Sequence, residues 1–260
     1  MSTNRSQKGF TMVELIMVIV IAGILAIGSV QFMGQATQGY SDAADRQQLA
    51  TIGWIASEKM SRELRNALPN SIRLNATGTC IEFIPVIGGS PYLTLPGETP
   101  TTPKSFTAVA SGFTEAPAST RVAVYPATTS DVYSNTSGSL SSSTIATLSE
   151  NTPSSGIDTI TLNNNFVFST DSPERRFYFT QNPIMYCVVG SQLNRYSEYG
   201  INPSIPTPLN PQIIVNKISS ASFVIASATL TRNAIVSMLF TLENGATHIV
   251  DHEVQIRNVP

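Results

Sequence analysis

One ionisable residue, Glu14, lies inside an otherwise uncharged apolar segment near the start of the chain. The segment reads FTMVELIMVIVIAGILAIGSV over residues 10–30, and the residues before it include Arg5 and Lys8 but no acid. An ionised side chain at the centre of a membrane helix costs about 2.5–3.5 kcal/mol or more, so such groups usually have a partner and a function. Glu14 is therefore the first residue to be explained.

The segment 10–30 is long enough to cross a bilayer as a helix, since about 20 apolar residues rising 1.5 Å each span the hydrocarbon core. Basic residues on its N-terminal flank predict that residues 1–9 stay in the cytoplasm and that the rest is exported. One alternative is a secretory signal cut near Ala26 or Gly28. Another is a simple anchor that tolerates Glu14 near its end. An acid is unusual in the first, and the second gives Glu14 no partner.

The segment KGFTMVEL, residues 8–15, resembles the processing motif of type IV prepilins and of type II secretion pseudopilins. The resemblance implies that a membrane-embedded prepilin peptidase cuts after Gly9 and methylates the new N-terminal residue, Phe10. It also implies that Glu14, at the fifth position of the mature chain, is the charge on which subunits dock.

Cleavage would create an ammonium group at Phe10, four residues before Glu14. The two could pair within one chain or between neighbouring subunits, and each buried charge would then have a partner. The simpler alternative is that Glu14 only complements the helix dipole. That alternative leaves its place in an apolar segment unexplained.

Helical periodicity returns after a polar stretch and continues to Pro69, which cannot extend a helix. Apolar residues at three- and four-residue steps form one stripe, which indicates packing on a sheet: Leu49, Ile52, Ala56, Met60, Leu64 and Leu68. We therefore expect a leader at residues 1–9 and one helix over residues 10–68, of which 10–30 crosses the membrane.

Beyond Pro69, short runs of β-branched and aromatic residues predict a β-rich head over residues 69–260. The predicted strands lie at 71–75, 80–86, 121–126, 157–162, 175–180, 184–190 and 192–197, followed by an alternating C-terminal third. Asn244-Gly245 predicts a hairpin there. Residues 97–156 are rich in Ser, Thr, Pro and Gly and predict an exposed loop or insertion. The predicted class is α+β and pilin-like: a long N-terminal helix packed on an antiparallel sheet.

Two cysteines, Cys80 and Cys187, lie far apart and in no metal-like spacing. If the head is exported, they are placed to form one disulfide, because oxidising compartments favour such bonds. The bond would close a loop of about 106 residues, worth at most about 4–5 kcal/mol in the chain-entropy description. Two buried free thiols are the alternative.

The remaining clusters favour neither an enzyme nor a nucleic-acid-binding protein. His248 and His252 would share one face of a strand and Asp251 the other, so neither a metal site nor a catalytic group is predicted. Arg175 and Arg176 precede three aromatic residues, which could stack on bases, but in a strand these residues alternate between core and rim. A net charge of −2 attracts no nucleic acid. We expect no enzyme activity and no cofactor.

Head segments at 60–74, 80–86, 176–200 and 254–260 resemble minor pilins of the MSHA type, the MshO subfamily, and more broadly PilW- and GspJ-like minor pilins and pseudopilins. The resemblance implies a minor pilin that contributes to assembly priming or lies at the fibre tip. Its implied partners are prepilin peptidase, other major and minor pilins and the inner-membrane assembly platform.

The implied location is the inner membrane, crossed once with a periplasmic C-terminal head, and then the assembled pilus at the cell surface. Two alternatives remain open: a type II secretion pseudopilin, and an adhesin or binding subunit carried on a pilin stem.

Overall fold

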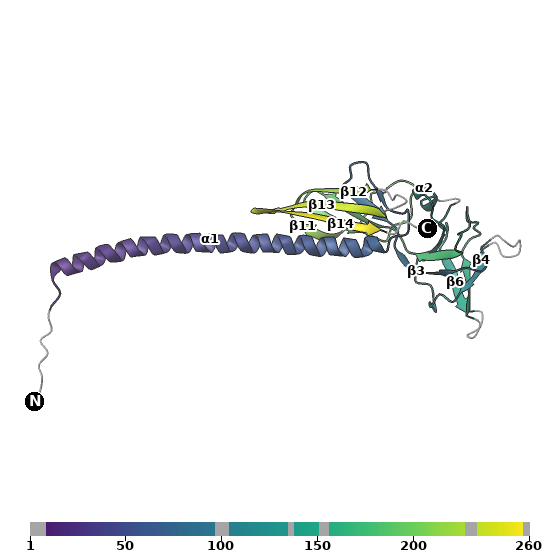
Figure 1. The fold of residues 1–260 in the computed structure, drawn as a ribbon, viewed down its shortest axis with the longest axis horizontal. Coiled ribbons are helices and arrows are strands. Elements are labelled where there is room, and N and C mark those ends of the chain that lie inside the picture. Colours follow the sequence, from purple (N-terminus) through teal and green to yellow (C-terminus); the bar gives the residue numbers. More distant parts are fainter. Residues whose placement is uncertain (1–8, 97–103, 135–137, 151–155, 227–232, 257–260) are drawn as a thin grey trace, which may run out of the picture. The chain divides into compact units, whose positions relative to one another are not determined.

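The structure, a computed structural model, divides into two compact units, Met1–Gln48 and Leu49–Pro260. It describes residues 9–96, 104–134, 138–150, 156–226 and 233–256. The first eight residues of the predicted leader and the last four of the segment 254–260 lie outside this described part. Helix α1, Met12–Arg65, contributes residues to both units (Figure 1).

The first unit consists of the N-terminal part of α1, which the rest of the described chain leaves uncovered. Residues 9–44 are all exposed, including large apolar side chains such as Ile16 and Ile24. The helix contains an 18-residue window with a mean hydropathy of 2.6, none of it buried. By length and composition it is the one helix in the described part that is able to cross a membrane.

In the second unit, the last turns of α1 pack on two antiparallel sheets. The first sheet has the strand order β1-β2-β9-β10-β11, and the second has the order β12-β13-β14. The strands of the first are β1 (Arg73–Leu74), β2 (Cys80–Phe83), β9 (Ile184–Val189), β10 (Gln192–Tyr196) and β11 (Gln212–Asn216). Those of the second are β12 (Ile218–Ala226), β13 (Ala234–Asn244) and β14 (Ala246–Ile256).

The predicted apolar stripe is confirmed from Leu49 to Leu64, whose side chains enter a helix–sheet core, whereas Leu68 lies beyond α1 in a separate buried cluster with Ile84. The helix–sheet core also holds residues of both sheets, among them Ile81, Tyr186, Met238 and Phe240. The closest approach is at Gly53, where an added Cβ would lie 2.5 Å from Cγ2 of Val250. Only glycine therefore lets the helix lie this close to the second sheet.

The helix ends at Arg65 rather than at the predicted Leu68. The amide of Leu68 donates to the carbonyl of Ile84, and that of Val86 donates to the carbonyl of Asn66. Residues 66–68 thus leave the helix because pairing with the 84–86 segment takes their backbone groups before Pro69 is reached.

The head contains two further three-stranded antiparallel sheets, ordered β3-β8-β5 and β4-β7-β6. Their strands are β3 (Val86–Pro91), β4 (Ser105–Val109), β5 (Arg121–Val124), β6 (Ile145–Glu150), β7 (Ile157–Leu162) and β8 (Arg176–Thr180), and a short helix α2 spans Thr129–Val132. An aromatic core joins them: the ring centroid of Phe177 lies 5.4 Å from that of Phe106 and 4.9 Å from that of Phe179, in edge-to-face contact.

The prediction of an exposed loop over residues 97–156 is wrong for its described part. The strand predicted at 121–126 is confirmed as β5, but strands β4 and β6 and helix α2 also lie there, and Phe106 and Ala108 are buried. The hydroxyl residues form the outer side of the sheet β4-β7-β6; Ser105, for example, contacts Thr161 across the strands at 3.0 Å. Because Thr is common in strands as well as in loops, the many Ser and Thr residues made the period-two pattern of these strands look like a loop sequence.

The hairpin predicted at Asn244-Gly245 is confirmed, with β13 and β14 paired along their whole length and Gly245 at φ 69°. The predicted fold class, a long N-terminal helix packed on antiparallel sheets in an α+β arrangement, is confirmed as well.

Candidate functional site

The N-terminus of α1 is capped by Thr11. The amide of Glu14 donates to Oγ1 of Thr11 at 3.3 Å, and the amide of Leu15 donates to the carbonyl of Thr11 at 3.2 Å. Thr11 and Glu14 therefore occupy the two positions of a capping box, Thr-x-x-Glu. Thr11 was not among the residues predicted for this site, although the Thr-x-x-Glu spacing is visible in the sequence.

Gly9 and Phe10 precede the cap and belong to no helix. Phe10 is 80% exposed, and a Cβ added at Gly9 would meet no atom within 4 Å. Exposed, non-helical backbone is the kind of segment that proteases cut. The bond between Gly9 and Phe10 is thus open to an enzyme.

The same geometry bears on the ion pair expected between Phe10 and Glu14. Because Phe10 lies before the helix, the two residues are not one helical turn apart in the uncleaved chain. The Glu14 carboxylate is exposed and has no partner in the described part of the chain. It is therefore available to a group from outside this chain.

The exposed apolar side chains that follow Glu14 on α1 would be stabilised by burial. Burying one such aliphatic side chain is worth about 1.5–3 kcal/mol, and Ile16, Val20 and Ile24 are 60%, 54% and 67% exposed. The first unit is therefore built to lie against lipid or against other apolar helices.

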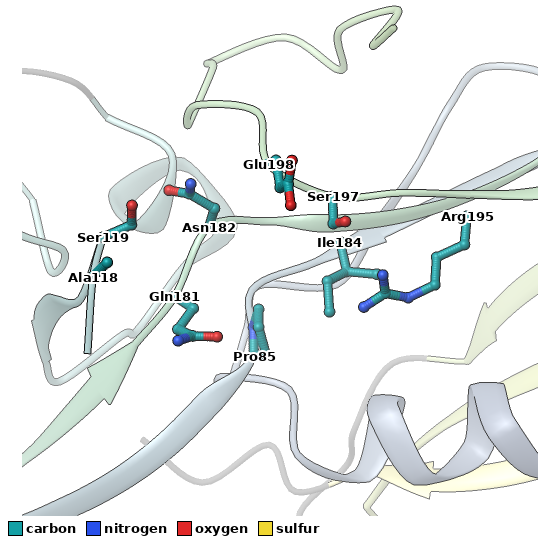
Figure 2. A pocket seen from close by; sticks show the side chains of 9 residues that line it. All are labelled: Pro85, Ala118, Ser119, Gln181, Asn182, Ile184, Arg195, Ser197 and Glu198. Atoms are coloured by element: carbon teal, nitrogen blue, oxygen red, sulfur yellow. The ribbon is translucent and has the colours of Figure 1, made fainter. Parts of the chain in front are cut away.

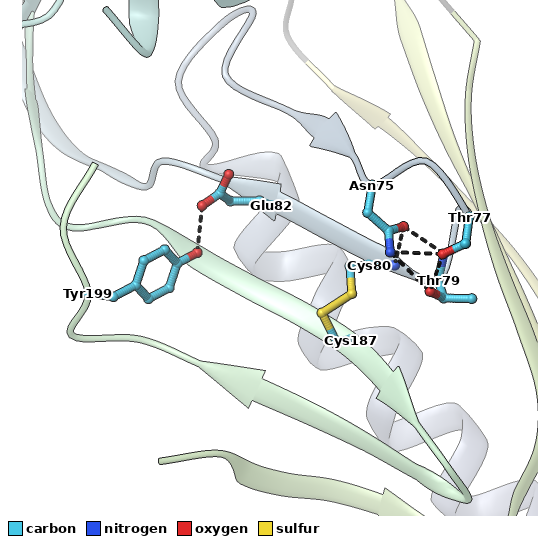
Figure 3. The surroundings of a disulfide bond; sticks show 7 residues. All are labelled: Asn75, Thr77, Thr79, Cys80, Glu82, Cys187 and Tyr199. Carbon is cyan, nitrogen blue, oxygen red and sulfur yellow. Dashed lines mark hydrogen bonds between the residues drawn. A yellow bond between two sulfur atoms is a disulfide. The ribbon is translucent and has the colours of Figure 1, made fainter. Parts of the chain in front are cut away.

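The head contains the predicted disulfide between Cys80 and Cys187. The two residues face each other on the neighbouring strands β2 and β9, with Cα atoms 4.1 Å apart (Figure 3). Sequence showed that a bond was possible, and the strand pairing shows why these two positions meet.

A tight turn positions Cys80. Oδ1 of Asn75 accepts hydrogen bonds from the amides of Thr79 and Cys80, both at 2.9 Å, and Gly78 adopts φ 67° (Figure 3). The turn thus orders the backbone at one end of the disulfide.

A buried ionic cluster lies on the same strand. Glu82, whose side chain is fully buried, pairs with Arg73 and accepts a hydrogen bond from the hydroxyl of Tyr199 at 2.8 Å. The Arg73 guanidinium also lies 3.5 Å from the centre of the Tyr133 ring. Burial, followed by the charge of Glu82, raises the pKa of both tyrosines. Removing one member of such a pair costs about 3–5 kcal/mol.

A second cluster joins α1 to the first sheet. The carboxylate of Glu63 accepts hydrogen bonds from the hydroxyl of Tyr186 at 2.9 Å and from Nε of Arg195 at 3.1 Å. Burial, followed by the charge of Glu63, raises the pKa of Tyr186. Both clusters use their charged groups to join segments distant in sequence.

The clusters considered for catalysis and for nucleic acid lie apart from these groups. In β14, His248 and His252 are partly buried while Asp251 is exposed, as the alternation of a strand predicts. In the described part of the chain, no three His, Cys, Asp or Glu side chains form a group able to hold a metal ion. In β8, Phe177 and Phe179 are buried in the aromatic core.

The raised pKa values of Tyr133, Tyr186 and Tyr199 predict alkaline instability of the head. An unfolded tyrosine ionises near pH 10, so the stability that these groups contribute is complete below about pH 10 and is lost as the pH rises further. We expect part of the phenolate absorbance of the eight tyrosines to appear only together with loss of the head's circular dichroism. Complete ionisation before any loss of structure would contradict this expectation.

The disulfide predicts a large loss of stability in the double variant Cys80→Ser/Cys187→Ser. Its two residues are separated by 107 positions, and a closed loop of that size is worth up to about 4.7 kcal/mol. Urea unfolding of the full chain without reductant measures the loss. Reductant serves as the matched control, because it should weaken the unsubstituted chain and leave the variant unchanged. Thiol alkylation of the folded chain without reductant would disprove the bond.

Comparison with known proteins adds one match. Residues 4–30 match the family described as the prokaryotic N-terminal methylation motif. Searches of curated proteins and of solved structures found no match. The matched segment contains Gly9, Phe10, Thr11 and Glu14, and with the exposed apolar helix it supports a type IV pilin-like prepilin, processed by prepilin peptidase and anchored in the inner membrane.

Proposed function

We propose that this chain is a structural subunit, not an enzyme: a minor pilin of a type IV pilus of the MSHA type. The observation that supports it most is the combination at the N-terminus of α1. A methylation motif with an accessible Gly9–Phe10 bond precedes an exposed apolar helix, and the carboxylate of Glu14 on that helix has no partner in the described part of the chain.

The assembly step follows from charge pairing. After cleavage, the methylated ammonium of Phe10 on one subunit pairs with Glu14 of its neighbour. Two unit charges 4 Å apart attract by about 4 kcal/mol at an effective dielectric constant of 20. The apolar side chains of the two helices then cover each other, and both charges leave the lipid with a partner.

The proposed place in the fibre is the tip or the priming complex. The second unit, Leu49–Pro260, is a large head with four sheets, which would be bulky to repeat at every turn of a thin fibre.

The proposed partners are the prepilin peptidase, other major and minor pilins and the inner-membrane assembly platform. Before assembly the subunit crosses the inner membrane once, with its head in the periplasm.

The variant Gly9→Val tests the processing step. We expect it to accumulate as the uncut chain in the membrane, whereas the unsubstituted chain acquires a methylated N-terminal Phe10, as measured by mass spectrometry of the intact protein. Gly28→Val is the matched control, since an added side chain meets no atom within 4 Å at Gly28, as at Gly9, and Gly28 lies outside the processing motif. Normal processing of Gly9→Val, or a block in Gly28→Val, would instead indicate cleavage at a secretory-signal site.

The variant Glu14→Gln tests the docking charge, because Gln keeps the capping box while removing the carboxylate. We expect normal insertion and cleavage but at least tenfold less crosslinking to other pilin subunits. The control Thr11→Val removes the cap and keeps the charge, and it should crosslink nearly as well as the unsubstituted chain. If Thr11→Val fails and Glu14→Gln succeeds, Glu14 acts only through helix capping.

A further inference from the structure

A polar pocket of about 380 Å³ opens in the head where four segments of the chain meet (Figure 2). The segments are the connection from β2 to β3, the loop before β5, the connection from β8 to β9, and the end of β10. The pocket is lined by Pro85, Ala118, Ser119, Gln181, Asn182, Ile184, Arg195, Ser197 and Glu198. Its volume lies in the range of small-molecule sites, about 300–1,000 Å³.

The polar side chains of this pocket have unused hydrogen-bonding capacity. The amides of Gln181 and Asn182 and the hydroxyls of Ser119 and Ser197 have no protein partner in the described part of the chain, and Gln181, Asn182 and Ser197 are partly buried. Figure 2 shows the amide of Asn182 directed toward Ser119. None of these atoms is among the buried unpaired side-chain atoms of the described residues, so water pairs with them in the free protein and a ligand with donors and acceptors can replace that water.

Two of the lining residues hold strained backbone. Ser119 has φ 63° and Glu198 has φ 67°, the left-handed region that non-glycine residues occupy at a cost of about 1–3 kcal/mol. They come from two different segments of the wall. The fold therefore maintains this shape on two sides of the pocket at some cost in stability.

The charges around the pocket favour a neutral ligand over an anionic one. Arg195 is already paired with Glu63 through Nε at 3.1 Å. Glu198, the other charged lining residue, is exposed and has no partner in the described part of the chain. With Glu63 counted beside Arg195, the local sum of charge is −1, so an added carboxylate or phosphate would be disfavoured next to Glu198.

We propose that this pocket binds one unit of a neutral saccharide. Carboxamides present a donor and an acceptor together, as do serine hydroxyls, and the adjacent hydroxyl groups of a sugar ring need both. The apolar surfaces of Pro85, Ala118 and Ile184 receive the C–H face of the ring. This function is separate from assembly, because every lining residue belongs to the head and none to the processing motif.

The test uses the full chain in a zwitterionic detergent that carries no sugar headgroup. Glucose, galactose, mannose and N-acetylglucosamine are titrated at millimolar concentration, with glucuronic acid as the charged probe, and binding is followed by saturation-transfer NMR. We expect at least one neutral sugar to bind, and to bind at least fivefold more weakly to Gln181→Ala/Asn182→Ala. The control Gln255→Ala, an exposed glutamine of β14, should leave binding unchanged.

A second experiment compares a charged with a neutral sugar and does not depend on the folding of Gln181→Ala/Asn182→Ala. Glucuronic acid should bind more weakly than glucose, and Glu198→Gln should reduce that difference, since it removes the repelling charge of an exposed residue. The proposal is overturned if no neutral sugar binds, if the folded double variant binds as well as the unsubstituted chain, or if glucuronic acid is the best ligand. None of these outcomes would affect the processing experiment at Gly9.

Discussion

The uncovered apolar surface of α1 is the constraint on which the rest of the molecule depends. Over residues 9–44 the described chain supplies no packing partner, so this part of the helix is stable only in lipid or against other apolar helices. Glu14 adds a second demand, because a carboxylate in such surroundings needs a cation. The proposed pairing of Glu14 with the ammonium of Phe10 on a neighbouring subunit would meet both demands together.

The head must therefore be stable by itself while the stem changes surroundings. It is stabilised by the helix–sheet core on residues 49–64 of α1, by the aromatic core around Phe177, and by the disulfide between β2 and β9. The clusters around Glu82 and Glu63 add specific polar connections between distant segments. Close contact at Gly53 fixes how near the helix lies to the second sheet.

Local patterns in the sequence predicted the elements whose side chains repeat regularly. The stripe from Leu49 to Leu64, the hairpin at Asn244-Gly245 and strand β7 at 157–162 all have a clear period. Strands β4 and β6 were missed because Ser and Thr occupy their exposed positions, which made two strands resemble a low-complexity loop. Strand β3 was missed because Gly88 and Gly89 interrupt its pattern.

The two sites also differ in how far the sequence alone predicts them. Gly9, Phe10 and Glu14 are adjacent in sequence, so a motif was enough to find them. The pocket proposed to bind a saccharide combines residues near 85, 118, 181 and 195, and only the packing of the sheets brings these together. No local pattern marks such a site.

The disulfide also has a mechanical consequence. A chain pulled at its ends lengthens as its domains unfold. The bond between Cys80 and Cys187 encloses strands β3 to β8 in a covalent loop, and its ends are separated by 107 positions. Fully extended, a segment of that length would add about 350–380 Å. While the bond is intact, force passes directly from β2 to β9, and the aromatic core inside the loop carries none of the load.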